Sequence, residues 1–190
     1  MKKQNRYRNY FSYLRKNIKF IYIILILYFA SVILGYFFPS LFKNYIDSFI
    51  KQILDMTKNM NFMQMFVFIF QNNLKTAFFG MLFGIFFCVF PLLLTSFNGY
   101  VLGYVSKLTI KEEGKLVLWK LLPHGVFELI AVFLSFAFGL KLGYVLLTSK
   151  KKKKEFFKEF SIILEIFVYV IIPLLLIAAL IEASLMFFCF

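Results

Sequence analysis

Apolar runs of about 20 residues are the feature that most constrains how this chain can fold. The clearest runs cover residues 18–38, 127–147 and 162–188. A helix of this length crosses the hydrocarbon core of a bilayer. Of the 190 residues, 62% are hydrophobic and 29 are phenylalanine, more apolar surface than a soluble domain of this size can bury. The sequence therefore predicts an all-α, polytopic transmembrane helical bundle, a single integral membrane domain over residues 1–190.

Two basic blocks set the expected orientation of this bundle. Residues 1–17 form a basic N-terminus without acidic residues, and residues 149–160 contain a run of five lysines. Lysine and arginine beside membrane spans stay in the cytoplasm, where anionic lipids also attract them. We therefore expect a multi-pass protein of the cell membrane with its N-terminus in the cytoplasm. Its partners would include membrane lipids and no nucleic acid.

The position of the basic blocks also limits the number of crossings. If both blocks are cytoplasmic, an even number of crossings separates them, and residues 18–38 and 127–147 supply two. The apolar region 74–106 would be roughly 50 Å long as one helix, which is too long for one crossing. We expect it to cross twice, although residues 93–110 could form a re-entrant hairpin instead. The total is about five crossings, with broken or re-entrant helices and the C-terminus outside.

Residues 40–73 are expected to form an extracytoplasmic amphipathic or interfacial segment. Pro39 and Ser40 end the first span, and from Leu41 to Leu54 apolar residues recur as pairs four apart with polar residues between them. This spacing predicts a helix with one apolar face that lies in the outer interface or packs on the bundle. Residues 59–61 end that helix, and a short apolar piece over residues 62–70 follows.

Small residues at four-residue spacing predict close contacts between helices. Glycine lets helix backbones approach, and close approach is a main source of helix association in lipid. The three pairs are Gly80 and Gly84, Gly99 and Gly103, and Gly139 and Gly143. They favour a tightly packed bundle or the seam of a homodimer. Pro123 and Gly125 add an expected bend, or hinge, at the start of the 127–147 span.

Several polar residues lie within or beside the apolar runs, where lipid penalises any polar group that lacks a partner or a wet cavity. They are Asn72, Asn73, Asn98, His124, Glu128 and Glu182. His124 and Glu128 are one helical turn apart and can face one ligand or each other. We expect these polar residues to gather at a shared centre. They would serve either as interhelical contacts or as a path for protons or ions.

The sequence has no set of residues typical of an enzyme. Its two aspartates, Asp47 and Asp55, lie in the amphipathic segment, and neither a Gly-x-Ser-x-Gly motif nor a phosphate-binding loop is present. A metal at His124 and Glu128 would need further ligands, and the chain has no second histidine. We therefore expect no catalytic residues, no metal site and no cofactor.

Five short motifs carry a family resemblance. They are QNNLK at residues 71–75, Pro91 followed by NGYVLG at 98–103, LPHGVFELIA at 122–131, GLKLG at 139–143 and AALIEA at 178–183. Together they resemble the stage II sporulation protein M (SpoIIM) family of integral membrane proteins, from about residue 72 to the C-terminus. The block Pro-His-Gly-x-x-Glu-Leu is the most specific part.

The resemblance implies a non-enzymatic role. In spore-forming bacteria the named member of the family looks like a membrane scaffold that gathers two peptidoglycan-degrading proteins during engulfment of the forespore. We therefore expect a membrane scaffold or assembly protein, a homodimer that organises other membrane proteins. The polar residues support an alternative, a channel or transporter for ions or small solutes that uses Glu128, Glu182 and His124.

Overall fold

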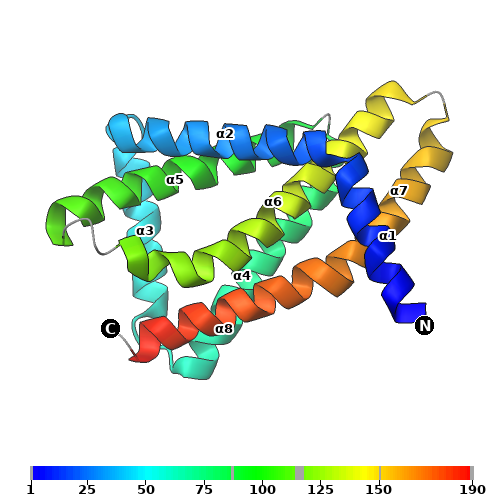
Figure 1. Cartoon of the computed structure of the whole chain (residues 1–190). Helices are drawn as coiled ribbons and strands as arrows, with labels where there is room; N and C mark the ends of the chain where they lie inside the picture. Colours follow the sequence, from blue (N-terminus) through cyan, green and yellow to red (C-terminus); the bar gives the residue numbers. More distant parts are fainter. Residues whose placement is uncertain (1, 87, 114–117, 150, 189–190) are drawn as a thin grey trace.

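The computed structural model describes residues 2–86, 88–113, 118–149 and 151–188. Within them the chain is almost entirely helical and contains no strand, so the all-α prediction is confirmed (Figure 1). The elements are α1 (Lys2–Lys16), α2 (Ile18–Phe37), α3 (Lys43–Thr57), α4 (Phe62–Leu82), η1 (Phe83–Ile85), α5 (Val89–Glu113), α6 (Leu118–Thr148), α7 (Lys152–Ile166), η3 (Phe167–Ile171) and α8 (Ile172–Phe188).

Five long helical segments form the bundle, in agreement with the expected five or so crossings. Four of them are long and apolar enough to span a membrane, namely Ile18–Phe37, Val89–Lys111, Gly125–Thr148 and Lys153–Phe187. The fifth is α4, which has 21 residues and packs along both α6 and α8 (Figure 1). Polar residues in its centre lower its hydropathy, and it lies alongside two of the four candidate spans.

The middle of the chain differs from the prediction in where its helices begin and end. The apolar piece 62–70 and the amides Asn72 and Asn73 belong to α4, because Asn61 and Gln64 form a capping box that starts the helix at Phe62. The chain turns after η1, where Cys88 has a left-handed φ of 65°. Pro91 lies in the first turn of α5, where a missing N–H removes no helical hydrogen bond.

The alternative of a re-entrant hairpin is wrong. Residues 93–110 lie in the single unbroken helix α5, so they form no re-entrant hairpin. Pro123 and Gly125 lie inside α6, which begins at Leu118, so the helix starts before the expected bend and not after it.

Glycines form a close seam between α2 and α5. A Cβ atom added at Gly103 would lie 2.0 Å from the carbonyl oxygen of Val32, and one added at Gly99 would lie 2.6 Å from that of Tyr28. Gly35 of α2 belongs to none of the three pairs. A Cβ atom added there would lie 2.1 Å from the carbonyl oxygen of Tyr100. Side chains at these positions would separate the two helices.

A second seam joins α4 and η1 to α6. An added Cβ at Gly84 would lie 2.0 Å from the carbonyl oxygen of Gly139, and one at Gly143 would lie 2.2 Å from that of Gly84. A Cβ atom added at Gly80 would instead lie 2.2 Å from the ring of Phe136. All three glycine pairs are therefore used inside the chain, which supports the expectation of a tightly packed bundle.

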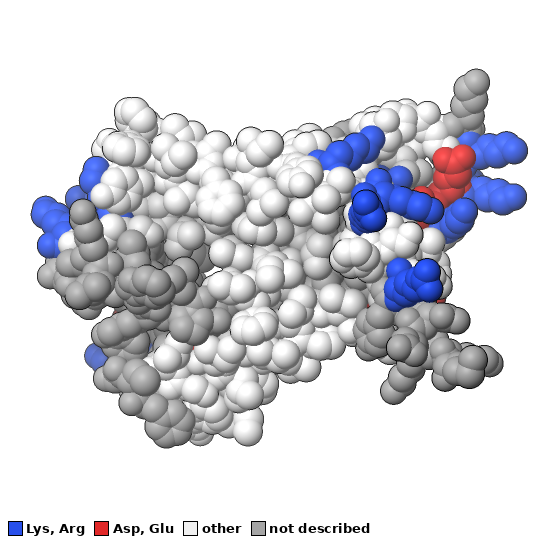
Figure 2. Space-filling view, in the orientation of Figure 1, with Lys and Arg blue, Asp and Glu red and all other residues white. Residues whose placement is uncertain are grey.

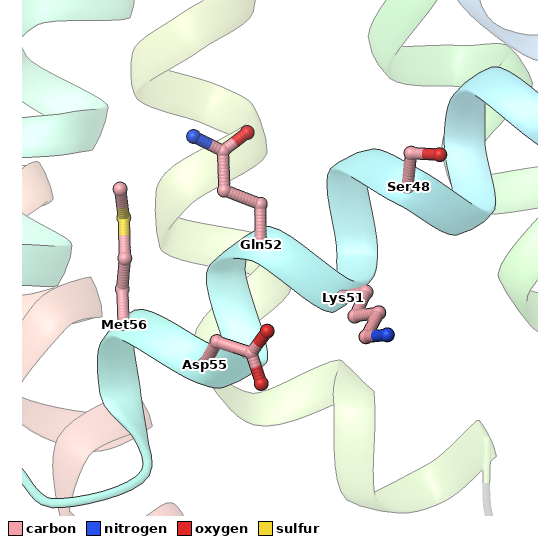
Figure 3. Close-up of a pocket in the computed structure, with 5 residues that line it drawn as sticks. All are labelled: Ser48, Lys51, Gln52, Asp55 and Met56. Atoms are coloured by element: carbon pink, nitrogen blue, oxygen red, sulfur yellow. The ribbon is translucent and has the colours of Figure 1, made fainter.

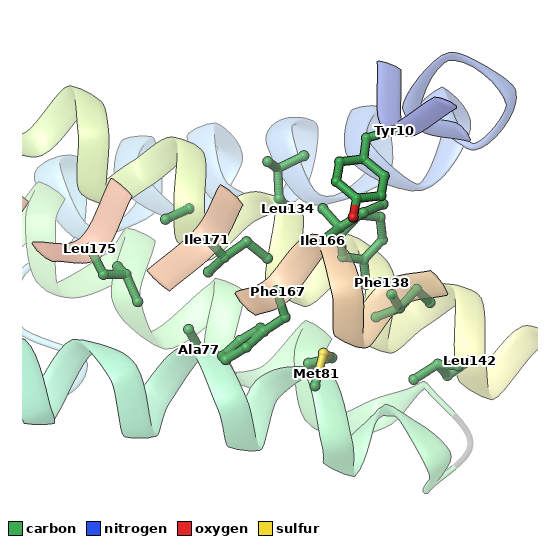
Figure 4. Packing of buried hydrophobic residues seen from close by; sticks show 12 residues of the cluster. Tyr10, Ala77, Met81, Leu134, Phe138, Leu142, Ile166, Phe167, Ile171 and Leu175 are labelled. Carbon is green, nitrogen blue, oxygen red and sulfur yellow. The ribbon is translucent and has the colours of Figure 1, made fainter. Parts of the chain in front are cut away.

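The largest apolar core lies beside this second seam, between α4, α6 and the segment α7–η3–α8. Figure 4 shows Ala77 and Met81 of α4 facing Phe167 of η3, with Leu134 and Phe138 of α6 in the same cluster. The fully buried Ser135 donates a hydrogen bond from its Oγ to the carbonyl oxygen of Ala77, 2.7 Å away. This bond places residue 77 of α4 level with residue 135 of α6.

The amphipathic helix α3 lies across one end of the bundle (Figure 1). Its single buried side chain, Ile46, packs against Tyr100 and Tyr104 of α5. The hydroxyl of Tyr104 donates a hydrogen bond to Oδ1 of Asp47 at 2.5 Å, and that of Tyr100 donates to the carbonyl oxygen of Phe38 at 2.6 Å. The predicted amphipathic helix therefore packs on the bundle through two tyrosines.

We expect Gly103→Ala to destabilise the bundle. Its new methyl group would clash with the Val32 carbonyl, and overpacking of this kind costs about 1–3 kcal/mol. Gly125→Ala is the matched control, because no atom lies within 4 Å of the added Cβ and alanine favours helix. Thermal unfolding in detergent micelles measures both variants. Equal unfolding temperatures for the two variants would contradict close backbone contact between α2 and α5 at Gly103.

We expect Tyr104→Phe to loosen α3 without unfolding the bundle, because it removes the hydrogen bond to Asp47. A loss of about 1 kcal/mol would speed amide hydrogen exchange in α3 by roughly fivefold. Tyr22→Phe, at an exposed position of α2, is the control. Unchanged exchange over residues 43–57 in the Tyr104 variant would show that the bond does not hold α3.

Candidate functional site

Two carboxylates from different helices meet near one end of the bundle. Glu128 of α6 and Glu182 of α8 are both partly buried and lie close enough to interact electrostatically. The phenol of Tyr28 in α2 is also within electrostatic range of Glu128. Among the described residues, neither carboxylate has a hydrogen-bond donor or an ion-pair partner. Three helices therefore converge on an acidic pair, which we call the Glu128–Glu182 pair.

The packing of α6 against α8 explains this convergence. The two helices run in opposite directions (Figure 1), and their register is fixed by the apolar cluster that contains Ala131 and Leu134 of α6 and Ile171 and Leu175 of α8. An early residue of α6 therefore lies beside a late residue of α8. This end of the bundle is opposite to the end that carries both basic blocks (Figure 1).

The other polar residues do not all join the pair. Asn73 is 8% exposed on the inner side of α4, whereas Asn72 is exposed on its outer side, because adjacent helical residues point about 100° apart. The amide of Asn98 donates to the carbonyl oxygen of Leu94 in its own helix, 2.8 Å away. His124 lies in α6, but its side chain is outside the described residues. Of these residues, only the two glutamates therefore lie within electrostatic range of each other.

A hollow on α3 lies away from the acidic pair. It measures about 450 Å³ and is lined by five residues of α3, namely Ser48, Lys51, Gln52, Asp55 and Met56 (Figure 3). Because one helix supplies the whole lining, the hollow is open and gives a small molecule no opposing wall. In the described part of the chain no group of three His, Cys, Asp or Glu residues is placed to hold a metal ion.

A second polar cluster, which the sequence analysis missed, ties the N-terminal helix to α7. Tyr10 donates from its hydroxyl to Oε2 of Glu165 at 3.1 Å, and Tyr13 donates to Oε2 of Glu159. Lys141 of α6 lies with its Nζ 3.8 Å from Oε1 of the same Glu159. Burial raises the pKa of Tyr13 above its ordinary value, and the neighbouring Glu159 adds to the effect.

This cluster explains why both basic blocks lie at one end of the molecule. Most of the segment expected as a basic loop, residues 149–160, is helical, because α7 begins at Lys152. Its acidic residues face the tyrosines of α1, and lysines and arginines cover the same end (Figure 2). Four long helices of the bundle, α2, α4, α5 and α6, lie between the two blocks, which is the even number expected. No local signal reveals these contacts, since the partners are about 150 residues apart in sequence.

The comparisons with known proteins match this architecture to one family. The family model described as "Stage II sporulation protein M" (SpoIIM) matches residues 24–185, from α2 to the last helix. No curated protein and no solved structure matches the chain. The matched region includes the two glycine seams, the amphipathic helix α3 and the Glu128–Glu182 pair. On this match, which covers most of its length, the chain belongs to the SpoIIM family of membrane proteins.

Proposed function

We propose that this protein is a non-enzymatic membrane scaffold that holds partner proteins at the cell membrane and works as a homodimer. The observation that carries the proposal is helix α3, which belongs to a chain of the SpoIIM family and has Ile46 as its only fully buried residue. We further propose that the end with the basic blocks faces the cytoplasm, because lysine and arginine stay on that side. Helix α3 then faces outward.

The exposed side chains of α3 support a role in docking. Leu54 and Met56 are 60% and 53% exposed, and they lie beside the polar hollow formed by Ser48, Lys51 and Asp55. Apolar side chains rimmed by polar ones are typical of surfaces that bind other proteins. Helix α3 therefore offers both an apolar anchor and polar groups to a partner protein.

Affinity purification from native membranes tests the scaffold. We expect the wild-type protein to co-purify with other membrane proteins in several mild detergents, and a Leu54→Ser/Met56→Ser variant to lose them because its apolar anchor is gone. Lys58→Ala, at the end of the same helix, is the control and should retain the partners. Recovery of only the protein itself from wild-type membranes would contradict the proposal.

The Glu128–Glu182 pair favours a second candidate function, the permeation or transport of cations or protons. Acidic side chains that lack partners inside spans often mark such paths. Here two of them, from α6 and α8, lie close together without a hydrogen bond to any described residue. The scaffold remains our first proposal, because neither glutamate lines the hollow on α3.

The variant Glu128→Gln separates these two functions, since glutamine keeps the shape of glutamate but removes its charge. If the protein is a scaffold, the variant should stay folded, change its stability by roughly 1 kcal/mol and keep its partners. If it conducts ions, flux of protons or cations into reconstituted liposomes should fall to background in this variant and in Glu182→Gln. Absence of any flux with the wild-type protein, across a range of pH and voltage, removes the second candidate.

A further inference from the structure

The outer face of α4 carries polar side chains at a depth where the other spans are apolar. Residue 77 is level with Ser135, near the centre of the Gly125–Thr148 span. At about 1.5 Å per residue, Lys75 lies about 3 Å and Asn72 about 8 Å along the helix from that level. The hydrocarbon core extends about 15 Å on either side of its centre. Both residues are therefore within the core.

Three of these side chains are exposed to the surroundings of the bundle. Gln71, Asn72 and Lys75 are all exposed, and none donates or accepts a hydrogen bond with any residue that the structure describes. The exposed residues of α2 at similar depth are apolar, for example Ile26 at 69% and Phe29 at 56%. A polar group that faces acyl chains loses its water and gains no partner, so this face of α4 is unfavourable in lipid.

Snorkelling does not relieve this cost. Lys75 has a long flexible stem that can carry its charge some way toward an interface. Gln71 and Asn72 have short side chains, so their carboxamides stay at the depth of their own Cα atoms. They need a partner from outside the chain, and the apolar side chains of Val67 and Phe79, at 40% and 42% exposure, border them on the same face.

We propose that this face of α4, formed by Gln71, Asn72 and Lys75 between Val67 and Phe79, binds the same face of a second copy of the chain. A carboxamide both donates and accepts hydrogen bonds, so amides from two copies related by a two-fold axis can pair with one another. The ammonium of Lys75 can donate to the amide oxygens of the other copy. Polar pairs of this kind hold helices together in membranes.

The proposal deepens one part of the proposed function, the homodimer, and does not depend on the scaffold role. The glycine pairs are used between helices of one chain, so they leave no glycine seam for a second copy. The amides and the lysine of α4 offer a surface that is complementary to itself. A partner of another kind would have to supply matching donors and acceptors, which a second copy carries by symmetry.

Cysteine cross-linking in native membranes tests the surface directly. In a background with Cys88→Ala and Cys189→Ala, we expect Asn72→Cys to form a disulfide-linked dimer on oxidation. Ile26→Cys, on the exposed face of α2, is the control and should stay monomeric. A cross-link from Asn72→Cys only to a different protein would overturn the assignment of a second copy.

A leucine variant tests the energetics. If the face binds a second copy, Gln71→Leu/Asn72→Leu/Lys75→Leu should weaken dimerisation in liposomes by about tenfold or more, measured by energy transfer between labelled copies. If the face meets lipid, the substitutions should leave association unchanged. If the leucine variant still dimerises and the Asn72→Cys protein forms no cross-link, the α4 interface is overturned but the homodimer is not. A wild-type protein that is monomeric in liposomes overturns both.

Discussion

Direct contact between helix backbones is the interaction on which this structure depends. Within one seam α2 and α5 meet at Gly35, Gly99 and Gly103, and within the other α4 and η1 meet α6 at Gly84 and Gly139. In lipid the hydrophobic effect does not drive helices together, so close approach has to supply much of the association energy. The many phenylalanines then fill the spaces around the seams and do not set the distance between helices.

The seams also decide which polar groups are inside and which are outside. Because α4 turns Gly80 toward α6, Asn73 faces inward and Asn72 and Lys75 face outward. Because α6 then packs against α8 in the opposite direction, Glu128 and Glu182 come together at one end. The acidic pair and the polar face of α4 are therefore two consequences of the same glycine positions, one inside the chain and one on its surface.

The sequence predicts most of the fold, because the length and hydropathy of each span, and the break at Pro39, are local features of the sequence. The start of α4 was also marked in the sequence, by Asn61 and Gln64, but the polar residues 71–73 obscured it. The meeting of Glu128 with Glu182 was expected from the cost of charge in lipid. The contacts of Tyr10 and Tyr13 with α7 could not be predicted, since they depend on how helices far apart in the chain pack together.

The order of the seams has a consequence for biosynthesis. Helix α2 leaves the ribosome long before its seam partner α5, and α4 leaves before α6. Each glycine groove must therefore remain open to acyl chains until the later helix is inserted. The turn that follows η1 links the two helix pairs, so the order in which they close follows the order of translation. Ribosome pausing or a rare codon after residue 113 would prolong the half-assembled state.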